Sequence, residues 1–216
     1  MTNKIRKILR IIILRFFETR LCEFLMWNII PYIRFTFYYT SFRGWRYQRG
    51  YKFVKPGRII LTNDSWKFTA FIIPGPWSHA TLCVTRDSEF EIAEMTHRHF
   101  TRSTFYDLCH ESTRVGIFEC TDWDEEYVKT VIKTCLTYKD ALYGLRKGPK
   151  FLSCSKMIVA SDPEHRLKAS HEDALGLGMS YVSPTDISEA LNIRKVWDSD
   201  DEVQPCWDDE IQMETV

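Results

Sequence analysis

Four short segments rich in β-branched and apolar residues, separated by turn-rich loops, place the strongest constraint on the fold of this chain. Segments of this kind predict β-strands, here over 58–62, 80–85, 89–95 and 114–120. Helical patterns follow. Residues 124–136 carry an apolar stripe that Asp122 is expected to cap, and helices are also predicted from residue 155 and over 187–191. We therefore predict an α+β fold, with an antiparallel sheet packed by helices.

The charge is unevenly distributed along a chain that is neutral as a whole. Lys plus Arg and Asp plus Glu both number 29, which excludes a uniformly basic nucleic-acid-binding protein. Residues 1–58 hold 13 Lys or Arg and only two Glu, whereas eight acidic residues and no Lys or Arg follow Lys195. We predict a basic, aromatic-rich helical extension (1–54), a main domain (55–195) and an acidic, mobile tail (196–216).

The basic extension has its own pattern. Apolar residues at helical spacing over 4–30 predict an amphipathic helix that ends or kinks at Pro31. Charged residues interrupt the apolar runs before they reach the length of a signal peptide or a membrane span. The Arg- and aromatic-rich segment 32–51 is expected to pack on the main domain. Attachment to an anionic membrane surface and stacking on single-stranded nucleic acid are the alternatives, and no sequence-specific nucleic-acid partner is expected.

The cysteines indicate the compartment. There are seven, an odd number, and no Cys-x-x-Cys pair occurs among them. This pattern disfavours a disulfide framework and a Cys-x-x-Cys zinc site. We expect free thiols in the cytoplasm or another reducing compartment.

Three separate segments carry residues suited to thiol chemistry. A turn-rich loop brings His79 to the start of a strand, where it could act as a general base. Glu94 on the next strand could reach the imidazole and fix its tautomer. Cys154 begins a predicted helix, where backbone N–H groups favour a thiolate and could bind an oxyanion. Each residue alone is more often structural, since free Cys behaves as a small buried hydrophobe.

The order and surroundings of these segments resemble the circularly permuted branch of the NlpC-type papain-like cysteine peptidases, the YiiX-like hydrolases. The resemblance runs from about residue 55 to residue 193. Its matching segments are Pro56-Gly57-Arg58-Ile59-Ile60-Leu61-Thr62, Ile73-Pro74-Gly75-Pro76-Trp77-Ser78-His79-Ala80, Glu94-Met95, Tyr106-Asp107, Tyr138-Lys139-Asp140, Cys154-Ser155-Lys156-Met157 and Ser183-Pro184.

The resemblance implies a permuted papain-like fold with a partly barrel-like sheet, beside which the extension would add an amphipathic helix. It also implies a catalytic Cys154, a base at His79 and an orienting Glu94, with no metal and no cofactor. The residues implied to bind substrate or support the site are Trp77, Ser78, Ser153 and Ser155. Lys156 stands where the family has an acidic residue, and it could lower the thiol pKa if it lies close by.

The implied activity is a thiol protease or amidase that cleaves an amide bond, with cell-wall peptides as the first candidate substrate. An acyl or lipid deacylase or acyltransferase with the same triad is the alternative enzyme. A non-catalytic binding module, such as a virion component with an occluded cleft, is the alternative outside enzymes. Residues 1–50 are the expected contact with a membrane surface or a protein partner. A metal site is a weaker alternative, with candidate ligands His97, His99, His110, Glu91 and Glu111.

Overall fold

The computed structural model describes residues 44–64, 70, 73, 75–86, 90–96, 98–144, 151–169, 172–173 and 180–201, and residues 24, 25, 28, 29 and 33 near the N-terminus. Three of the regions discussed above lie largely outside the described residues. They are the predicted amphipathic helix over 4–30, the part of segment 32–51 that precedes residue 44, and the tail after residue 201.

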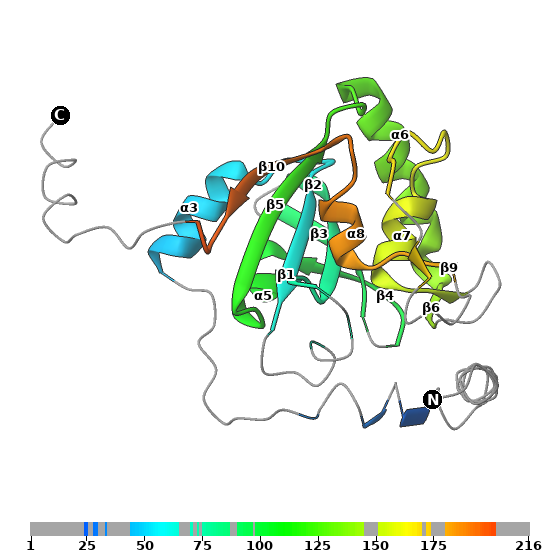
Figure 1. The fold of residues 1–216 in the computed structure, drawn as a ribbon, viewed down its shortest axis with the longest axis horizontal. Helices are drawn as coiled ribbons and strands as arrows, with labels where there is room; N and C mark the ends of the chain where they lie inside the picture. The colour runs from blue at the N-terminus through cyan, green and yellow to red at the C-terminus, as the bar shows by residue number, and fades with distance from the viewer. Residues whose placement is uncertain are drawn as a thin grey trace, which may run out of the picture.

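A six-stranded sheet forms the centre of the fold (Figure 1). Its strands lie in the order β10-β5-β1-β2-β3-β4, and every neighbouring pair is antiparallel. The strands are β1 (Ile59–Asn63), β2 (His79–Arg86), β3 (Phe90–Met95), β4 (Phe100–Thr104), β5 (Arg114–Cys120) and β10 (Ile193–Asp198). The prediction of an α+β fold with an antiparallel sheet is confirmed. Over the described residues β10 and β4 are open edges, so the sheet is not a closed barrel.

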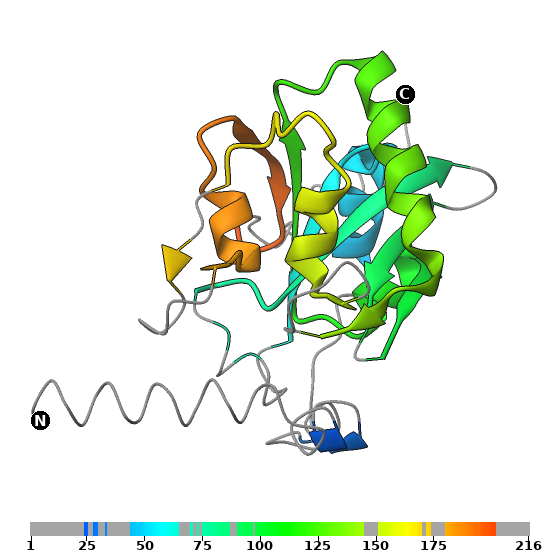
Figure 2. The same cartoon turned by 90° about the vertical axis from the view of Figure 1, so that its right-hand side faces the viewer.

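Helices cover both faces of this sheet (Figures 1 and 2). One face packs against α6 (Glu125–Leu136), α7 (Cys154–Ala160) and α8 (Pro184–Ser188), and the other against α3 (Trp45–Phe53) and α5 (Phe105–His110). Neighbouring residues of a strand point to opposite faces, and β1 shows this directly. Its Ile59 belongs to the core beneath α6 and α7, whereas Ile60 belongs to the core beneath α3 and α5.

Short elements complete the described fold. A parallel pair of two-residue strands, β6 (Leu142–Tyr143) and β7 (Phe151–Leu152), leads into α7. A one-turn helix, η2 (Thr137–Asp140), extends α6, and β8 (Glu172–Asp173) pairs with β9 (Ser180–Tyr181). No helix over the described residues combines the length and hydropathy that a bilayer span requires.

Two helix starts differ from the predicted ones. Asp124, not Asp122, caps α6, because its carboxylate accepts the N–H of Tyr127 at 2.8 Å. The last short helix, α8, begins at Pro184 rather than at residue 187. Its start is a capping box between Ser183 and Asp186, each side chain accepting the other's backbone N–H. Proline is favoured in the first turn of a helix, because its missing N–H needs no partner there.

The aromatic segment packs on the domain over its described part. Tyr47 and Tyr51 of α3 lie against Phe105 and Phe90, with ring centroids 5.6 and 4.9 Å apart. This agrees with the packing interpretation of segment 32–51.

At the other end of the chain, residues 196–198, assigned above to the acidic tail, complete β10. Its Trp197 is buried, because it packs in the core beneath α3.

Candidate active site

His79 and Glu94 meet across two neighbouring strands. In the antiparallel pairing of β2 with β3, Thr81 lies opposite Glu94, so His79, two residues earlier, is a diagonal neighbour on the same face. The Nε2 atom of His79 lies 2.9 Å from Oε2 of Glu94. The two side chains are 25% and 13% exposed, so the pair is largely shielded from water. This is the contact between the two side chains that the sequence predicted.

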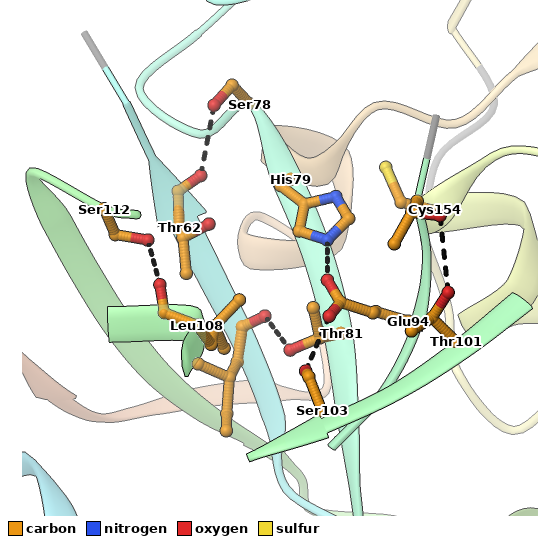
Figure 3. A network of polar contacts seen from close by, with 12 residues as sticks. Thr62, Ser78, His79, Thr81, Glu94, Thr101, Ser103, Leu108, Ser112 and Cys154 are labelled. Atoms are coloured by element: carbon orange, nitrogen blue, oxygen red, sulfur yellow. Dashed lines mark hydrogen bonds and ion pairs between the residues drawn. The ribbon is translucent and has the colours of Figure 1, made fainter. Parts of the chain in front are cut away.

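Cys154 enters the same site from α7. The helix begins there because Ser153 caps it, with Oγ accepting the N–H of Lys156 at 3.2 Å. Helix α7 packs on β2 and β3, and Cys154 is only 2% exposed. Figure 3 shows the sulfur of Cys154 beside the imidazole of His79, whose other side faces Glu94. The structure therefore brings together the three residues that sequence reasoning selected.

The electrostatics of the site favour an ion pair between the thiol and the imidazole. Burial lowers the pKa of His79, but hydrogen bonds and charge interactions with Cys154 and Glu94 outweigh burial and raise this pKa to about 10. Burial raises the pKa of Cys154, yet the hydrogen bond and charge of His79, with smaller contributions from the Ala80 N–H and Ser155, bring it below its usual value. A thiolate beside an imidazolium is the reactive form of a cysteine nucleophile.

The other described cysteines behave differently. All four are buried and free, and burial raises the pKa of each thiol. The pKa rises to about 12 for Cys83 and to about 11 for both Cys120 and Cys135, and it is also well above the usual value for Cys109. Among the described thiols, only that of Cys154 has a lowered pKa.

The four predicted supporting residues have structural contacts. Trp77 is 3% exposed, packs edge-on against Phe118 and lies under the guanidinium of Arg114, so it stabilises the loop before His79. Ser78 donates its backbone N–H to the Thr62 carbonyl at 3.0 Å. Ser153 caps α7, and the buried Ser155 places Oγ 3.8 Å from the Cys154 sulfur. These contacts support the site; none of them places a substrate.

Sequence reasoning missed two residues near His79, Glu94 and Cys154. Ser103 donates a hydrogen bond to Oε1 of Glu94 at 2.6 Å, but β4 was not among the predicted strands. The second residue is Tyr143 of β6. The pKa of the Tyr143 phenol is raised, mainly by burial and in part by the negative charge of the nearby Cys154. No local sequence signal marked Tyr143. The ammonium of Lys156 donates to the Phe151 carbonyl at 3.2 Å, and the groups that lower the pKa of Cys154 are His79, the Ala80 N–H and Ser155.

The structure gives no support to the alternative of a metal site over the described residues. Over the described residues no group of three or more His, Cys, Asp or Glu side chains is arranged to hold a metal ion. Glu91 pairs with Arg102, and His110 stacks on Tyr106. His99 is exposed at a bridge to Leu142, and His97 lies outside the described residues.

Gly75 fixes the loop that carries His79. Its φ of +92° lies in the left-handed region, and a Cβ at this position would overlap the side chain of Thr185 on α8. We expect Gly75→Ala to lower the free energy of unfolding by about 2–3 kcal/mol, through backbone strain and steric overlap. Urea denaturation measures this loss. Gly44→Ala is the control, because Gly44 also has a positive φ but its Cβ would meet nothing within 4 Å. An equal loss in both variants would contradict the role of Thr185.

Comparison with known proteins identifies the fold. No family model and no curated protein matches this chain. The structure is similar to the crystal structure of the metalloprotein YiiX from Escherichia coli O157:H7, with a TM-score of 0.54 and 13% sequence identity. The match covers 66% of this chain and 96% of YiiX. At this identity the likeness shows a YiiX-like fold and no more.

Proposed function

We propose that this chain is a cysteine hydrolase of the permuted NlpC, papain-like type, with Cys154 as nucleophile, His79 as base and Glu94 as orienting residue. The observation that carries the proposal is the position of the imidazole, which contacts the Glu94 carboxylate through one nitrogen and lies beside the Cys154 sulfur. This set of a nucleophile, a base and a group that orients the base is typical of covalent catalysis at acyl groups.

The residues divide the reaction between them. The Cys154 thiolate attacks the carbonyl carbon and forms a C–S bond, and the carbonyl oxygen becomes an oxyanion. The backbone N–H of Cys154, in the first turn of α7, would donate to this oxyanion, because the first N–H groups of a helix have no partner within it. The tetrahedral intermediate then expels the amine, which takes its proton from the His79 imidazolium. Water, deprotonated by His79, attacks the thioester carbonyl, and the C–S bond breaks. The carboxylic acid is released, and the Cys154 thiolate is restored beside the His79 imidazolium.

Glu94 keeps the imidazole in one orientation and stabilises its positive charge. Its contact with Nε2 leaves the other ring nitrogen for the thiol. The family resemblance supports the same roles, since the histidine and its carboxylate precede the cysteine in the permuted branch. It also supports an amide as the bond cleaved, with a cell-wall peptide as the first candidate substrate.

The proposed reaction uses no metal ion. The similar structure YiiX is described as a metalloprotein. The described residues of the present chain do not fit a metal ion, because they contain no group of three or more His, Cys, Asp or Glu side chains that could bind one. We derive no step through a metal ion.

Product analysis distinguishes the candidate activities. We expect wild-type protein incubated with muropeptides to generate new amine and carboxyl ends, detected by mass spectrometry, and Cys154→Ala protein to generate none. A parallel incubation with phospholipid and acyl-thioester substrates serves as the comparison. Release of free fatty acid without peptide cleavage would replace the peptidase by a deacylase, because the same triad attacks either carbonyl. No Cys154-dependent product from either panel would favour a non-catalytic binding module.

A further inference from the structure

Glu94 is held at both oxygens of its carboxylate. Oε2 lies 2.9 Å from Nε2 of His79, and Oε1 accepts a hydrogen bond from the hydroxyl of Ser103 at 2.6 Å. Figure 3 shows the carboxylate between the imidazole and the serine. The triad described above accounts for only the first of these two contacts.

The strand register places Ser103 at this position. In the pairing of β3 with β4, Ile92 lies opposite Ser103 and Glu94 lies opposite Thr101. Ser103 is therefore a diagonal neighbour of Glu94 on the same face, in the same relation that His79 has to Glu94 across β2 and β3. The three polar side chains form one line across three consecutive strands.

We propose that Ser103 is a positioning residue of this site, whose hydroxyl holds the Glu94 carboxylate in the orientation that directs Oε2 to His79. The inference rests on the proposed function, because it assigns Ser103 a role in preparing the Cys154 nucleophile. Ser103 acts through Glu94 and His79, and neither the thiol nor the acyl carbon is its partner.

Two physical effects give the hydroxyl this role. A carboxylate held by one hydrogen bond can turn about its terminal bond, whose torsional preference is broad, and this rotation would break the contact with the imidazole. A hydrogen bond to an ionised carboxylate is also stronger than one between neutral groups and favours the ionised form. An ionised Glu94 keeps the proton on His79, and the imidazolium in turn keeps Cys154 as a thiolate.

The same reasoning gives the direction of change when the hydroxyl is lost. The groups that act on His79 are Glu94 from β3 and Cys154 from α7, and Tyr143 of β6 also interacts with the thiol. Without Ser103 the negative charge beside His79 is less well fixed, so the imidazolium is less stable. Cys154 should then lose its proton at a higher pH than in the wild type.

Thr101 offers a matched control. It is on the same strand and face as Ser103, directly opposite Glu94. Its hydroxyl contacts the Thr96 hydroxyl at 3.4 Å and the His99 carbonyl at 3.5 Å. Thr101→Val therefore removes a neighbouring hydroxyl while keeping a β-branched residue in β4.

The test measures how fast iodoacetamide alkylates Cys154 in the folded full-length protein, from acidic to alkaline pH, with the Cys154 peptide quantified by mass spectrometry. We expect Ser103→Ala to raise the apparent pKa of Cys154 by about half a unit, and so to slow alkylation about threefold on the acidic side. Ser103→Thr should restore the wild-type profile, and Thr101→Val should leave it unchanged. Added to Glu94→Gln, Ser103→Ala should produce no further shift, because both act through one carboxylate.

Superimposable profiles for Ser103→Ala and wild type would overturn the inference, as would an equal shift in Thr101→Val. Failure of the proposed function has a different signature. In that case wild-type Cys154 would be alkylated no faster at neutral pH than the other buried cysteines, whichever residue stands at position 103.

Discussion

Cys154→Ala should abolish the fast alkylation that iodoacetamide produces at neutral pH among the five described cysteines, and it should reduce hydrolysis of a cleaved substrate by about a thousandfold or more. The reason is that Cys154 is the described thiol whose pKa is lowered, while burial raises the pKa of the others. Mass spectrometry of the labelled, folded protein measures the first effect, and single-turnover product formation measures the second.

Cys135→Ala is the matched control for this prediction. Cys135 is also fully buried in the core beneath α6 and α7, and burial raises the pKa of its thiol to about 11. Its replacement should change neither labelling nor turnover, although it removes a buried sulfur in the same way. Unchanged labelling in Cys154→Ala, or labelling spread evenly over the cysteines, would rule out a specialised nucleophile at position 154.

His79→Gln should convert Cys154 into an ordinary buried thiol. In the wild type the thiolate and the imidazolium coexist from the lowered pKa of Cys154 up to about pH 10, where His79 loses its proton. The alkylation rate should therefore be level through neutral pH and fall only in acid. In the variant the rate should reach half its maximum only at or above the ordinary cysteine pKa of about 8.5, which leaves a few per cent of thiolate at neutral pH and a loss of about thirtyfold or more.

Hydrolysis should fall further than alkylation in His79→Gln, because the variant also lacks the acid that protonates the leaving group. His99→Gln is the control, since His99 is exposed and bonded through its backbone at the edge of β4. It should leave both rates unchanged. A level alkylation profile in His79→Gln would show that another group activates the thiol.

The three residues of the proposed triad were accessible to sequence reasoning because each has a local signal. His79 follows a Pro- and Gly-rich loop, Glu94 lies in a strongly apolar strand, and Cys154 begins a helix after a serine cap. Their order along the chain then matched a known family pattern. The spatial contact itself needed the sheet register, which places His79 and Glu94 diagonally across β2 and β3.

Ser103 and the end of β10 were missed for physical reasons. In β4 only Phe100 is a buried apolar residue, because the strand is an edge with a largely polar surface, so the alternating pattern that reveals a strand is weak. At the C-terminus the density of acidic residues indicated a solvated tail. The carboxylate of Asp198 instead receives two hydrogen bonds from Arg114 on β5, at 3.1 and 2.7 Å, and composition says nothing about such a distant partner.

The division of the site between a meander of consecutive strands and a later helix has a consequence during synthesis. His79, Glu94 and Ser103 come from β2, β3 and β4, which adjoin in both sequence and sheet, whereas Cys154 arrives with α7. Local pairings form sooner than distant ones, so we expect the nascent chain to bring the imidazole of His79 and the carboxylate of Glu94 together before Cys154 joins them. Until α7 docks, Cys154 should therefore keep the pKa of an ordinary thiol and react only slowly with oxidants and electrophiles.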